Sequence, residues 1–388
     1  MKRLRVGVIY GGRSGEHEVS LASAAAVIGN LDRTRYEPVP IRIERDGRWT
    51  LPDRPPTALS AAETIEQARL ENARSIRPLR EVHVVARPGQ DTILTIDRQR
   101  GGEGAGELDT ARVTGLGLDV MFPVLHGPYG EDGTVQGLLE LANVAYVGAG
   151  VLASAVGMDK AVMKVVFAAH GLPVPDYLVV RRKDWLASRD AVVETITARL
   201  TLPVFVKPAN LGSSVGISKA KDIEGLRHAI DLAAEFDRKI VVEAAVPQAR
   251  EIECAVLGND EPQASVPGEV VPSREFYDYE AKYLDEGSTL VIPAKLEAAQ
   301  TEQIQRLSIA AFRAVDAAGM ARVDFLIDGR DARIYVSEVN TIPGFTTISM
   351  YAKLWAASGL DYASLLDRLI ALALERHAEK QQLRTSVA

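Results

Sequence analysis

Four polar side chains near the carboxyl end of the chain have types and spacing suited to metal and phosphate chemistry. They are Arg322, Asp324, Glu338 and Asn340. Arg322 and Asp324 belong to one short segment typical of a strand, and Glu338 and Asn340 belong to a second. The D-G-R-D sequence between the two segments favours a tight turn. Because side chains alternate between the faces of a strand, all four can gather on one patch of the hairpin. Carboxylate and amide oxygens suit Mg²⁺, so the hairpin predicts a metal and phosphate site; a solvated hairpin with cross-strand ion pairs is the alternative.

Two glycine-containing segments could bring backbone N–H groups to a ligand. Pro343-Gly344 follows the acidic strand, where a glycine has no Cβ to keep a ligand away. Lys207 ends an apolar strand, and the G-S-S-V-G sequence at 212–216 can then curl over a phosphate with N–H groups and hydroxyls. The pattern G-x-x-x-x-G-K-[ST] does not occur there, so the segment is not a P-loop. A β-hairpin turn would look similar.

Acidic and histidine side chains at the ends of other predicted elements are further candidates. Glu16 and His17 lie at the start of a predicted helix, where a carboxylate can meet a cationic ligand or serve only as a helix N-terminal acid. His126 follows a strand, at the end where open α/β sheets bind ligands, although a structural histidine bonded to the loop backbone is commoner. Glu243 and Glu251 could accept hydrogen bonds from an adenine amino group and a ribose, or be edge-strand acids.

The scaffold begins with a βαβ pattern. Leu4–Tyr10 is typical of a buried strand, and a glycine turn, an apolar helix and a second strand at Val39–Ile43 follow it. This order predicts a parallel α/β domain. The dinucleotide fingerprint G-x-G-x-x-G is absent, which disfavours a nicotinamide-dependent oxidoreductase. From Thr50 to Asp109 the periodic signal weakens, and we interpret the stretch as an insertion with a polar helix at Ala58–Ala73 and a glycine-rich surface loop.

The rest of the chain alternates predicted strands and helices. One helix ends at Gly171 and has Lys160 near its beginning, where an exposed lysine is the ordinary interpretation. An aromatic loop at 268–288 has Lys282-Tyr283 as its polar centre. The remaining predicted elements are a helix at Ile223–Phe236, strands at 239–246 and 251–258, and helices at 297–319 and 360–377.

Length and composition set the broad class. With 388 residues the chain suggests two or three domains. A net charge of −7 disfavours a nucleic-acid or anionic-membrane surface, so a phosphate site must be a focused one. Cys254 is the only cysteine, which excludes an internal disulfide and fits a reducing compartment; we assign it to packing. The start has no signal-peptide pattern and no run of eighteen apolar residues occurs, so we expect a soluble, cytoplasmic protein.

Seven motifs in order carry a resemblance to a known family. They are G-G-x-S-x-E-H-E-V-S, H-G-P-x-G-E-D-G-x-x-Q-G-L-L-E, M-D-K, V-K-P-x-x-x-G-S-S-V-G, F-Y-D-Y-x-A-K-Y, R-x-D-F and E-x-N-T-x-P-G-F-T. Together they resemble the D-alanine–D-alanine ligase family of the ATP-grasp fold, over nearly the whole chain except the 50–109 stretch and the tail. The resemblance implies an N-terminal Rossmann-like parallel α/β domain at 1–148 with a variable insertion at 50–110, followed by two α+β domains at 149–247 and 248–388 that clasp ATP.

The resemblance also implies roles for individual residues. ATP would contact Lys160, Lys207, Ser213, Ser214, Glu243, Val246, Glu251 and Lys282. Two Mg²⁺ ions, with Mn²⁺ as an alternative, would be held by Asp324, Glu338 and Asn340. Glu16, Ser213 and Tyr283 would form a hydrogen-bonded set that pins two loops over the site. The first substrate would meet Glu16 and His126, Arg322 and the Gly344 N–H would stabilise an oxyanion, and Ser349 with Met350 would hold the second substrate's carboxylate.

The implied activity is ATP-dependent joining of two D-alanines through a D-alanyl phosphate, for peptidoglycan precursor synthesis. The implied partners are D-alanine and ATP, with no nucleic acid and no membrane, in a homodimer. A depsipeptide ligase that uses D-lactate is one alternative, disfavoured by A-K-Y at 281–283, and a non-catalytic ATP-binding regulator is another, disfavoured because no metal ligand or phosphate lysine is lost. One departure from the family is Ala244, where many relatives carry a lysine facing the adenine pocket, so the details of base stacking are open.

Overall fold

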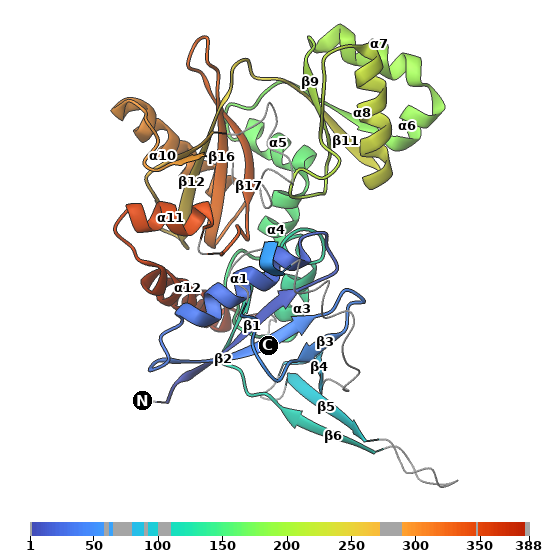
Figure 1. Ribbon diagram of the computed structural model, residues 1–388. Helices are drawn as coiled ribbons and strands as arrows, with labels where there is room; N and C mark the ends of the chain where they lie inside the picture. Colours follow the sequence, from blue (N-terminus) through green and yellow to red (C-terminus); the bar gives the residue numbers. More distant parts are fainter. Residues whose placement is uncertain are drawn as a thin grey trace, which may run out of the picture. The chain divides into compact units, whose positions relative to one another are not determined.

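The computed structural model describes residues 2–57, 62–64, 80–88, 92–99, 110–271, 289–346 and 348–384. The chain divides into two compact units (Figure 1). The first comprises Met1–Val151, Gly258–Glu261 and Ile342–Ala388, and the second comprises Leu152–Leu257 and Pro262–Thr341. Among the described residues, no helix has both the length and the apolar character needed to cross a membrane.

The first unit is built on a sheet with the strand order β6-β5-β4-β3-β2-β1-β7. Its strands are β1 (Leu4–Gly11), β2 (Tyr36–Ile43), β3 (Trp49–Leu51), β4 (Arg80–Val84), β5 (Ile93–Gln99), β6 (Thr110–Gly115) and β7 (Val120–Pro123). Strand β1 is parallel to β2 and β7, which confirms the βαβ opening. Strands β3 to β6 extend this sheet in an antiparallel order. The stretch interpreted as an insertion therefore contributes strands that we did not predict, while most of the predicted 58–73 helix lies outside the described residues.

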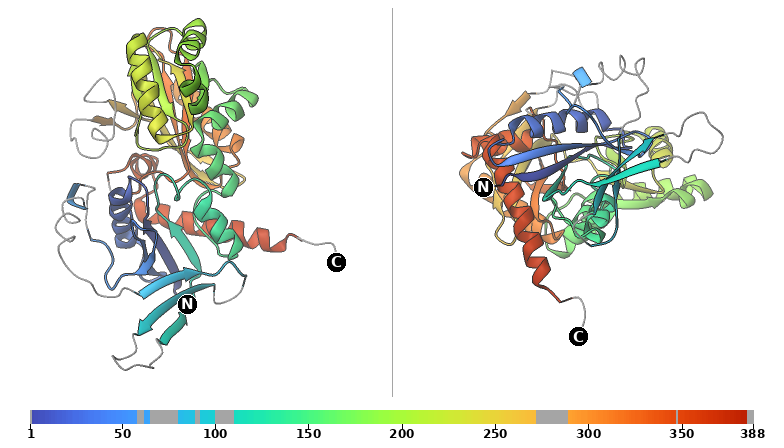
Figure 2. Two further views of the ribbon diagram at one scale, coloured as in Figure 1. Left: turned by 90° about the vertical axis from the view of Figure 1, so that its right-hand side faces the viewer. Right: turned by 90° about the horizontal axis from the view of Figure 1, so that it is seen from below.

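Helices from the first 151 residues and from the C-terminal segment belong to the first unit. They are α1 (His17–Asn30), α3 (Thr134–Leu141), α11 (Met350–Ala357) and α12 (Tyr362–Gln382). Small side chains in the S-L-A-S-A-A-A sequence let α1 lie close against β1, and its Ser20, Ser23 and Ala24 are fully buried. Helix α12 packs on α1 and β7 (Figure 2). The three-domain division at 148 and 247 stays a prediction.

The second unit contains two sheets, of which the smaller has the order β10-β9-β11-β8. Its strands are β8 (Tyr177–Arg181), β9 (Val204–Pro208), β10 (Ser218–Ala220) and β11 (Lys239–Ala244). One face packs against α6 (Arg182–Ala187), α7 (Arg189–Arg199) and α8 (Ile223–Phe236), with alternate residues such as Val204, Val206, Ile240 and Val242 in the core. The opposite side chains of β9 and β11, including Lys207, therefore point to the other face.

The larger sheet of the second unit has the order β15-β14-β12-β16-β17, with β13 paired to β12. Its strands are β12 (Arg250–Gly258), β13 (Gln263–Ala264), β14 (Gly268–Val271), β15 (Thr289–Val291), β16 (Gly319–Ile327) and β17 (Ile334–Asn340). Helix α10 (Ala298–Ala314) packs on β16 and β17. Alternate residues of β12 and β16, among them Ile252, Cys254, Val323 and Phe325, form the core. Cys254 is thus a packing residue, as predicted, and burial raises the pKa of its thiol to about 11.

Two helices occupy the stretch before β8 where we predicted one. They are α4 (Val151–Met158) and α5 (Lys160–Ala169). Asp159 separates them, because its backbone is extended and its side chain accepts hydrogen bonds from the N–H groups of Ala161 and Val162. An aspartate at this position is an N-cap, so it starts a new helix. The residue that follows the cap is Lys160.

Candidate active site

The predicted hairpin is present, and its register puts the four polar residues on one face. Strands β16 and β17 pair antiparallel, with Arg322 opposite Asn340 and Asp324 opposite Glu338. Arg322 donates to Asp324 through Nε at 2.7 Å and through a terminal nitrogen at 2.6 Å. Asn340 Nδ2 donates to Asp324 Oδ2 at 3.0 Å. The ion pair of Arg322 with Asp324 lies within β16, and the Asn340 hydrogen bond crosses from β17, so these contacts bring the predicted metal oxygens together.

A fifth polar residue on this face, which is charged, was missed from the sequence. Glu253 lies on β12, and its Oε2 is 3.1 Å from Nε of Arg322. Burial alone would lower the pKa of Arg322, but Asp324 and Glu253 outweigh it and raise that pKa well above its ordinary value. Arg322 is thus a permanently charged group held between two carboxylates. The sequence did hold a signal for Glu253: the alternation E-I-E at 251–253 puts it on the same strand face as Glu251, which was already a candidate.

The donor set fits a divalent cation. Asp324 and Glu338 supply carboxylate oxygens and Asn340 supplies an amide oxygen, the hard ligands that Mg²⁺ and Mn²⁺ take in proteins. No group of three or more histidine, cysteine, aspartate or glutamate side chains suited to a metal was found among the described residues. Two carboxylates and an amide leave coordination positions for water and phosphate oxygens. Metal binding by these three residues stays a prediction.

Lys160 approaches the same face from the start of α5. Its Nζ donates to the Leu211 carbonyl oxygen at 2.7 Å and lies 3.7 Å from Glu338 Oε2. Its backbone N–H donates to the Ala209 carbonyl oxygen at 2.9 Å. Asp159, besides capping α5, forms an ion pair with Lys239 of β11. The cap and the ion pair together fix the first turn of α5, and with it the position of the Lys160 ammonium.

Replacing Asp159 with alanine is expected to move Lys160 as well as destabilise α5. Loss of an N-cap costs about 1 kcal/mol, and leaving the partly buried Lys239 without its partner adds to that cost. We expect the KM for ATP to rise about tenfold, since Lys160 is predicted to contact a phosphate. Urea denaturation and steady-state kinetics measure the two effects. Asp222→Ala is the matched control, because Asp222 caps α8 through the Gly225 N–H but has no predicted ATP contact; an equal rise in KM there would contradict this role for Asp159.

The face of the smaller sheet opposite α6, α7 and α8 holds a buried cluster of three charged residues. Glu243 of β11 is 1% exposed; its Oε1 is 3.1 Å from Lys207 Nζ and its Oε2 is 2.5 Å from Lys164 Nζ. Burial alone would raise the pKa of Glu243, but the ammonium groups of Lys164 and Lys207 outweigh it and lower that pKa to about 2. Glu243 is therefore ionised at every physiological pH. It is not an edge-strand acid, because β11 lies between β9 and β8.

Lys164 was not predicted. It lies one turn after Lys160 on α5 and its side chain is 1% exposed. The available signal was the K-x-x-x-K spacing, since residues four apart share a helix face. A lysine is almost never fully buried unless it is paired, so the sequence favoured an exposed side chain until its partner was known.

The remaining ATP candidates also lie in the second unit. Ser213 and Ser214 have φ values of 49° and 58°, and Gly216 has a φ of 70°. Such left-handed conformations are uncommon for serine, and they cluster at turns and ligand-binding loops. Val246 follows β11, and Glu251 lies on β12. Lys282 and Tyr283 lie outside the described residues, so their predicted contacts, including that of Tyr283 with Glu16 and Ser213, have no structural counterpart here.

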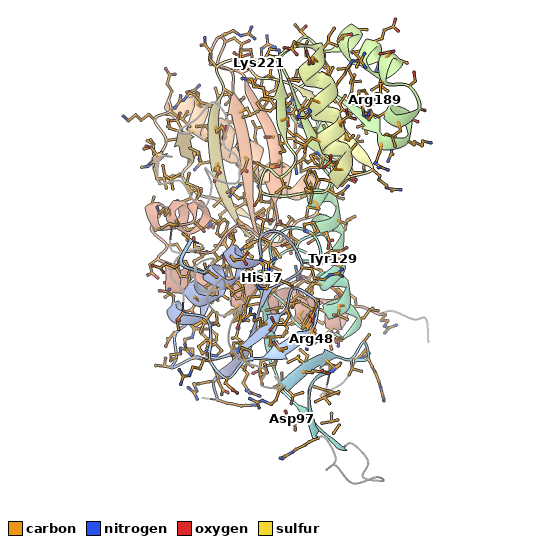
Figure 3. All side chains as sticks on the ribbon, turned by 45° about the vertical axis from the view of Figure 1, so that its right-hand side comes forward. His17, Arg48, Asp97, Tyr129, Arg189 and Lys221 are labelled. Carbon is orange, nitrogen blue, oxygen red and sulfur yellow. The ribbon has the colours of Figure 1, made fainter. Side chains whose placement is uncertain are left out.

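The substrate candidates Glu16 and His126 lie in the first unit. Ser14 connects them, because its hydroxyl donates to the His126 carbonyl oxygen at 2.6 Å and accepts from the Glu16 N–H at 3.2 Å. Gly127 has a φ of 75°, and a Cβ there would come within 2.7 Å of Glu16 Oε2. Beside Glu16, His17 is the first residue of α1 (Figure 3). Its Nδ1 lies 2.7 Å from the Gly12 carbonyl oxygen. Burial lowers the pKa of His17, so it is a neutral, structural residue.

His126 is buried and bonded to the backbone, the case that the sequence left open. Its Nδ1 lies 3.1 Å from the Ile342 carbonyl oxygen and its Nε2 lies 3.1 Å from Ser23 Oγ. Burial lowers the pKa of His126, while Glu16 and the Ile342 carbonyl oppose the shift. A direct contact between His126 and substrate stays a prediction.

Gly344, Ser349 and Met350 lie together in the first unit, around the start of α11. Ser349 occupies the N-cap position, but its hydroxyl accepts from the Thr346 N–H at 2.9 Å instead of capping the helix. A Cβ on Gly344 would lie 3.1 Å from Ser349 Oγ, so this close packing favours glycine. The N-terminus of α11 begins with Met350, and a helix N-terminus attracts a carboxylate.

Lysines suited to phosphates lie beside a serine-glycine loop at one sheet, and oxygens suited to a metal ion lie on a face of the other sheet. This is the arrangement of ATP-grasp enzymes, and this protein is of that class. Models of the D-ala D-ala ligase N-terminus and C-terminus match residues 5–149 and 166–371. The chain belongs to the D-alanine–D-alanine ligase family.

Similar proteins cover nearly the full length of the chain. D-alanine–D-alanine ligases of Heliobacterium modesticaldum and Natranaerobius thermophilus are 48% and 46% identical to it, each over 98% of this chain and 98% of the relative. Among solved structures, the D-alanine–D-alanine ligase from Coxiella burnetii is 37% identical with a TM-score of 0.78, covering 98% of this chain and 97% of that one. The VanG D-Ala:D-Ser ligase from Enterococcus faecalis is 34% identical with a TM-score of 0.78, covering 96% and 100%.

Proposed function

We propose that this protein is an ATP-dependent ligase that joins two D-alanines into D-alanyl-D-alanine for peptidoglycan precursor synthesis. Membership of the family supports the reaction, and one geometric observation supports its chemistry. That observation is the sheet face on which Asp324, Glu338 and Asn340 meet, with the Lys160 ammonium 3.7 Å from Glu338. Such a face can bind the phosphates of a nucleotide together with their metal ions.

ATP binds to the residues of the second unit. Glu243, kept ionised by its two lysines, accepts a hydrogen bond from the adenine amino group, Val246 contacts the base and Glu251 accepts from the ribose. Lys160, Lys207 and Lys282 bind the phosphates, with Ser213 and Ser214 over them. Asp324, Glu338 and Asn340 would hold two Mg²⁺ ions, or Mn²⁺, which supply charge neutralisation on the transferring phosphoryl group.

The first D-alanine is activated at its carboxylate. Its ammonium group binds Glu16, and its carboxylate lies near His126. A carboxylate oxygen attacks the γ-phosphorus of ATP, the bond to the β,γ-bridging oxygen breaks, and ADP leaves with D-alanyl phosphate formed. Lys160 and Lys207 neutralise charge on the phosphates during this step. Glu16, Ser213 and Tyr283 close two loops that exclude the water that would hydrolyse the acyl phosphate.

The second D-alanine then attacks with its amine. Ser349 and the N-terminus of α11 at Met350 hold its carboxylate. Its nitrogen bonds to the acyl carbon, and Arg322 and the Gly344 N–H stabilise the tetrahedral oxyanion. The acyl C–O bond to phosphate then breaks, and inorganic phosphate leaves with the proton that the amine nitrogen loses as the amide forms. The A-K-Y sequence at 281–283 favours an amine over the hydroxyl of D-lactate. A homodimer and a cytoplasmic location stay predictions.

The test is product formation by the purified protein. With ATP, Mg²⁺ and D-alanine we expect equimolar ADP and phosphate, and a dipeptide with the mass of D-alanyl-D-alanine. Parallel reactions contain L-alanine alone, or D-alanine with D-lactate or D-serine. No ADP with D-alanine would overturn the proposal, and a preference for D-lactate as second substrate would support the depsipeptide ligase. ATP binding without turnover of any of these substrates would support the regulator.

A further inference from the structure

We propose that Ser23 is a positioning residue that sets the place of the Gly344 N–H by tying together the two sides of the loop that contains it. The proposal rests on the proposed function, in which that N–H binds the oxyanion. Ser23 lies on α1, more than 300 residues earlier in the chain, and both segments belong to the first unit.

The first tie holds the residue two positions before Gly344. The Ile342 carbonyl oxygen can only accept a hydrogen bond, so the proton of His126 is on Nδ1, 3.1 Å away. Burial lowers the pKa of His126, which keeps the ring neutral and leaves Nε2 as an acceptor. The group 3.1 Å from Nε2 is the Ser23 hydroxyl, which therefore donates to it. Ser23 thus fixes the imidazole that holds Ile342.

The second tie holds the residue immediately after Gly344. The Phe345 N–H donates to Ser23 Oγ at 3.2 Å, so the same hydroxyl accepts from the loop while it donates to His126. The Tyr362 hydroxyl donates to the Phe345 carbonyl oxygen at 2.6 Å. The Phe345 ring is fully buried, with its centroid 5.9 Å from that of Phe122 and 5.5 Å from that of Tyr351. Phe345 is therefore held at its N–H, its carbonyl and its ring.

Ser23 is suited to this role because it is fully buried and both of its hydrogen-bonding functions are used. Alanine in its place would leave the Phe345 N–H and His126 Nε2 without their shared partner, and buried polar groups without partners are costly. The loop and the imidazole would shift to find other partners. A shift of about 1 Å in an oxyanion donor can cost on the order of a hundredfold in rate, because donor and oxyanion must be aligned at the transition state.

The experiment compares Ser23→Ala with Ser20→Ala. Ser20 is a matched control on the same helix, since it is equally buried and its hydroxyl accepts from the Gly11 N–H at 2.8 Å and donates to the Val124 carbonyl oxygen. Each variant loses a buried hydroxyl that donates one hydrogen bond and accepts another, but only the Ser23 hydroxyl bonds to the loop that contains Gly344. For Ser23→Ala we expect kcat to fall about 10- to 100-fold while the KM for ATP stays within about twofold. For Ser20→Ala we expect kcat within about threefold of the original protein, with a similar loss in melting temperature.

A kcat for Ser23→Ala within about twofold of the original protein, or equal losses in both variants, would overturn the inference. Hydrogen exchange of the unmodified protein gives a second measurement, which does not depend on whether a variant folds. The Phe345 amide should exchange slowly although it lies outside any strand or helix, and fast exchange would also overturn the inference. If the unmodified protein does not ligate D-alanine at all, the proposed function fails instead, and slow exchange at Phe345 would still show the tie.

Discussion

Asp324→Asn is expected to lower kcat by roughly a thousandfold and to weaken Mn²⁺ binding measured by electron paramagnetic resonance with ADP present. Metal ions contribute several kcal/mol to phosphoryl-transfer transition states, and about 4 kcal/mol corresponds to a thousandfold. Asp324 is at the centre of the polar face, where it accepts from Arg322 and from Asn340 Nδ2 at 3.0 Å. The neutral amide keeps the shape of the side chain and removes the charge that binds the ion.

The matched control is Asp328→Asn. Asp328 lies at the turn of the same hairpin and pairs with Arg330 at 3.0 Å, so the substitution changes the net charge equally without touching the polar face. We expect its kcat and Mn²⁺ affinity to match those of the original protein. A slow Asp324→Asn enzyme that still binds Mn²⁺ normally would mean that Asp324 acts by holding Arg322, and an active variant would remove the metal site from this hairpin.

The hairpin was predictable because its information is local. Alternation with a period of two, a turn sequence between the strands and the identity of four side chains were enough to put Arg322 and Asp324 beside Glu338 and Asn340. Helix α8 was predicted with its observed bounds for the same reason, since its apolar residues repeat with helical spacing. Ordered motifs then supplied the family, which local periodicity could not.

The partners that the sequence did not predict come from distant strands and helices. Glu253 reaches Arg322 only because β12 lies beside β16, and Lys164 reaches Glu243 only because the fold brings this turn of α5 to β11. Ser23 and Phe345 are more than 300 residues apart. Strands β4 and β5 were missed for a further reason: both contain charged residues and turn-forming residues separate them, so their alternation is weak.

Lys164→Met is expected to lower the free energy of unfolding at pH 7 by about 3 kcal/mol, because breaking a buried ion pair leaves a charge without its partner. Lys164 and Glu243 are each 1% exposed and lie 2.5 Å apart. Lys207 remains 3.1 Å from Glu243 in the variant, so the carboxylate keeps one of its two cations. Urea denaturation measures the loss. Lys183→Met is the control, since it removes an exposed lysine from α6 and should change the unfolding free energy little.

The acid dependence of stability tests the same cluster without relying on one variant's packing. The pKa of Glu243 is about 2 in the folded protein and 4.5 in the unfolded chain, so the folded state favours the ionised form. Above pH 4.5 that preference contributes fully, and it is lost as the pH falls through this window to about 2, for a total of about 3 kcal/mol. In Lys164→Met the depression of the Glu243 pKa is smaller, so unfolding free energy should fall less steeply with acid than in the original protein. Parallel acid slopes in the two proteins would mean that Lys207 alone keeps Glu243 ionised, and that Lys164 contributes packing rather than charge.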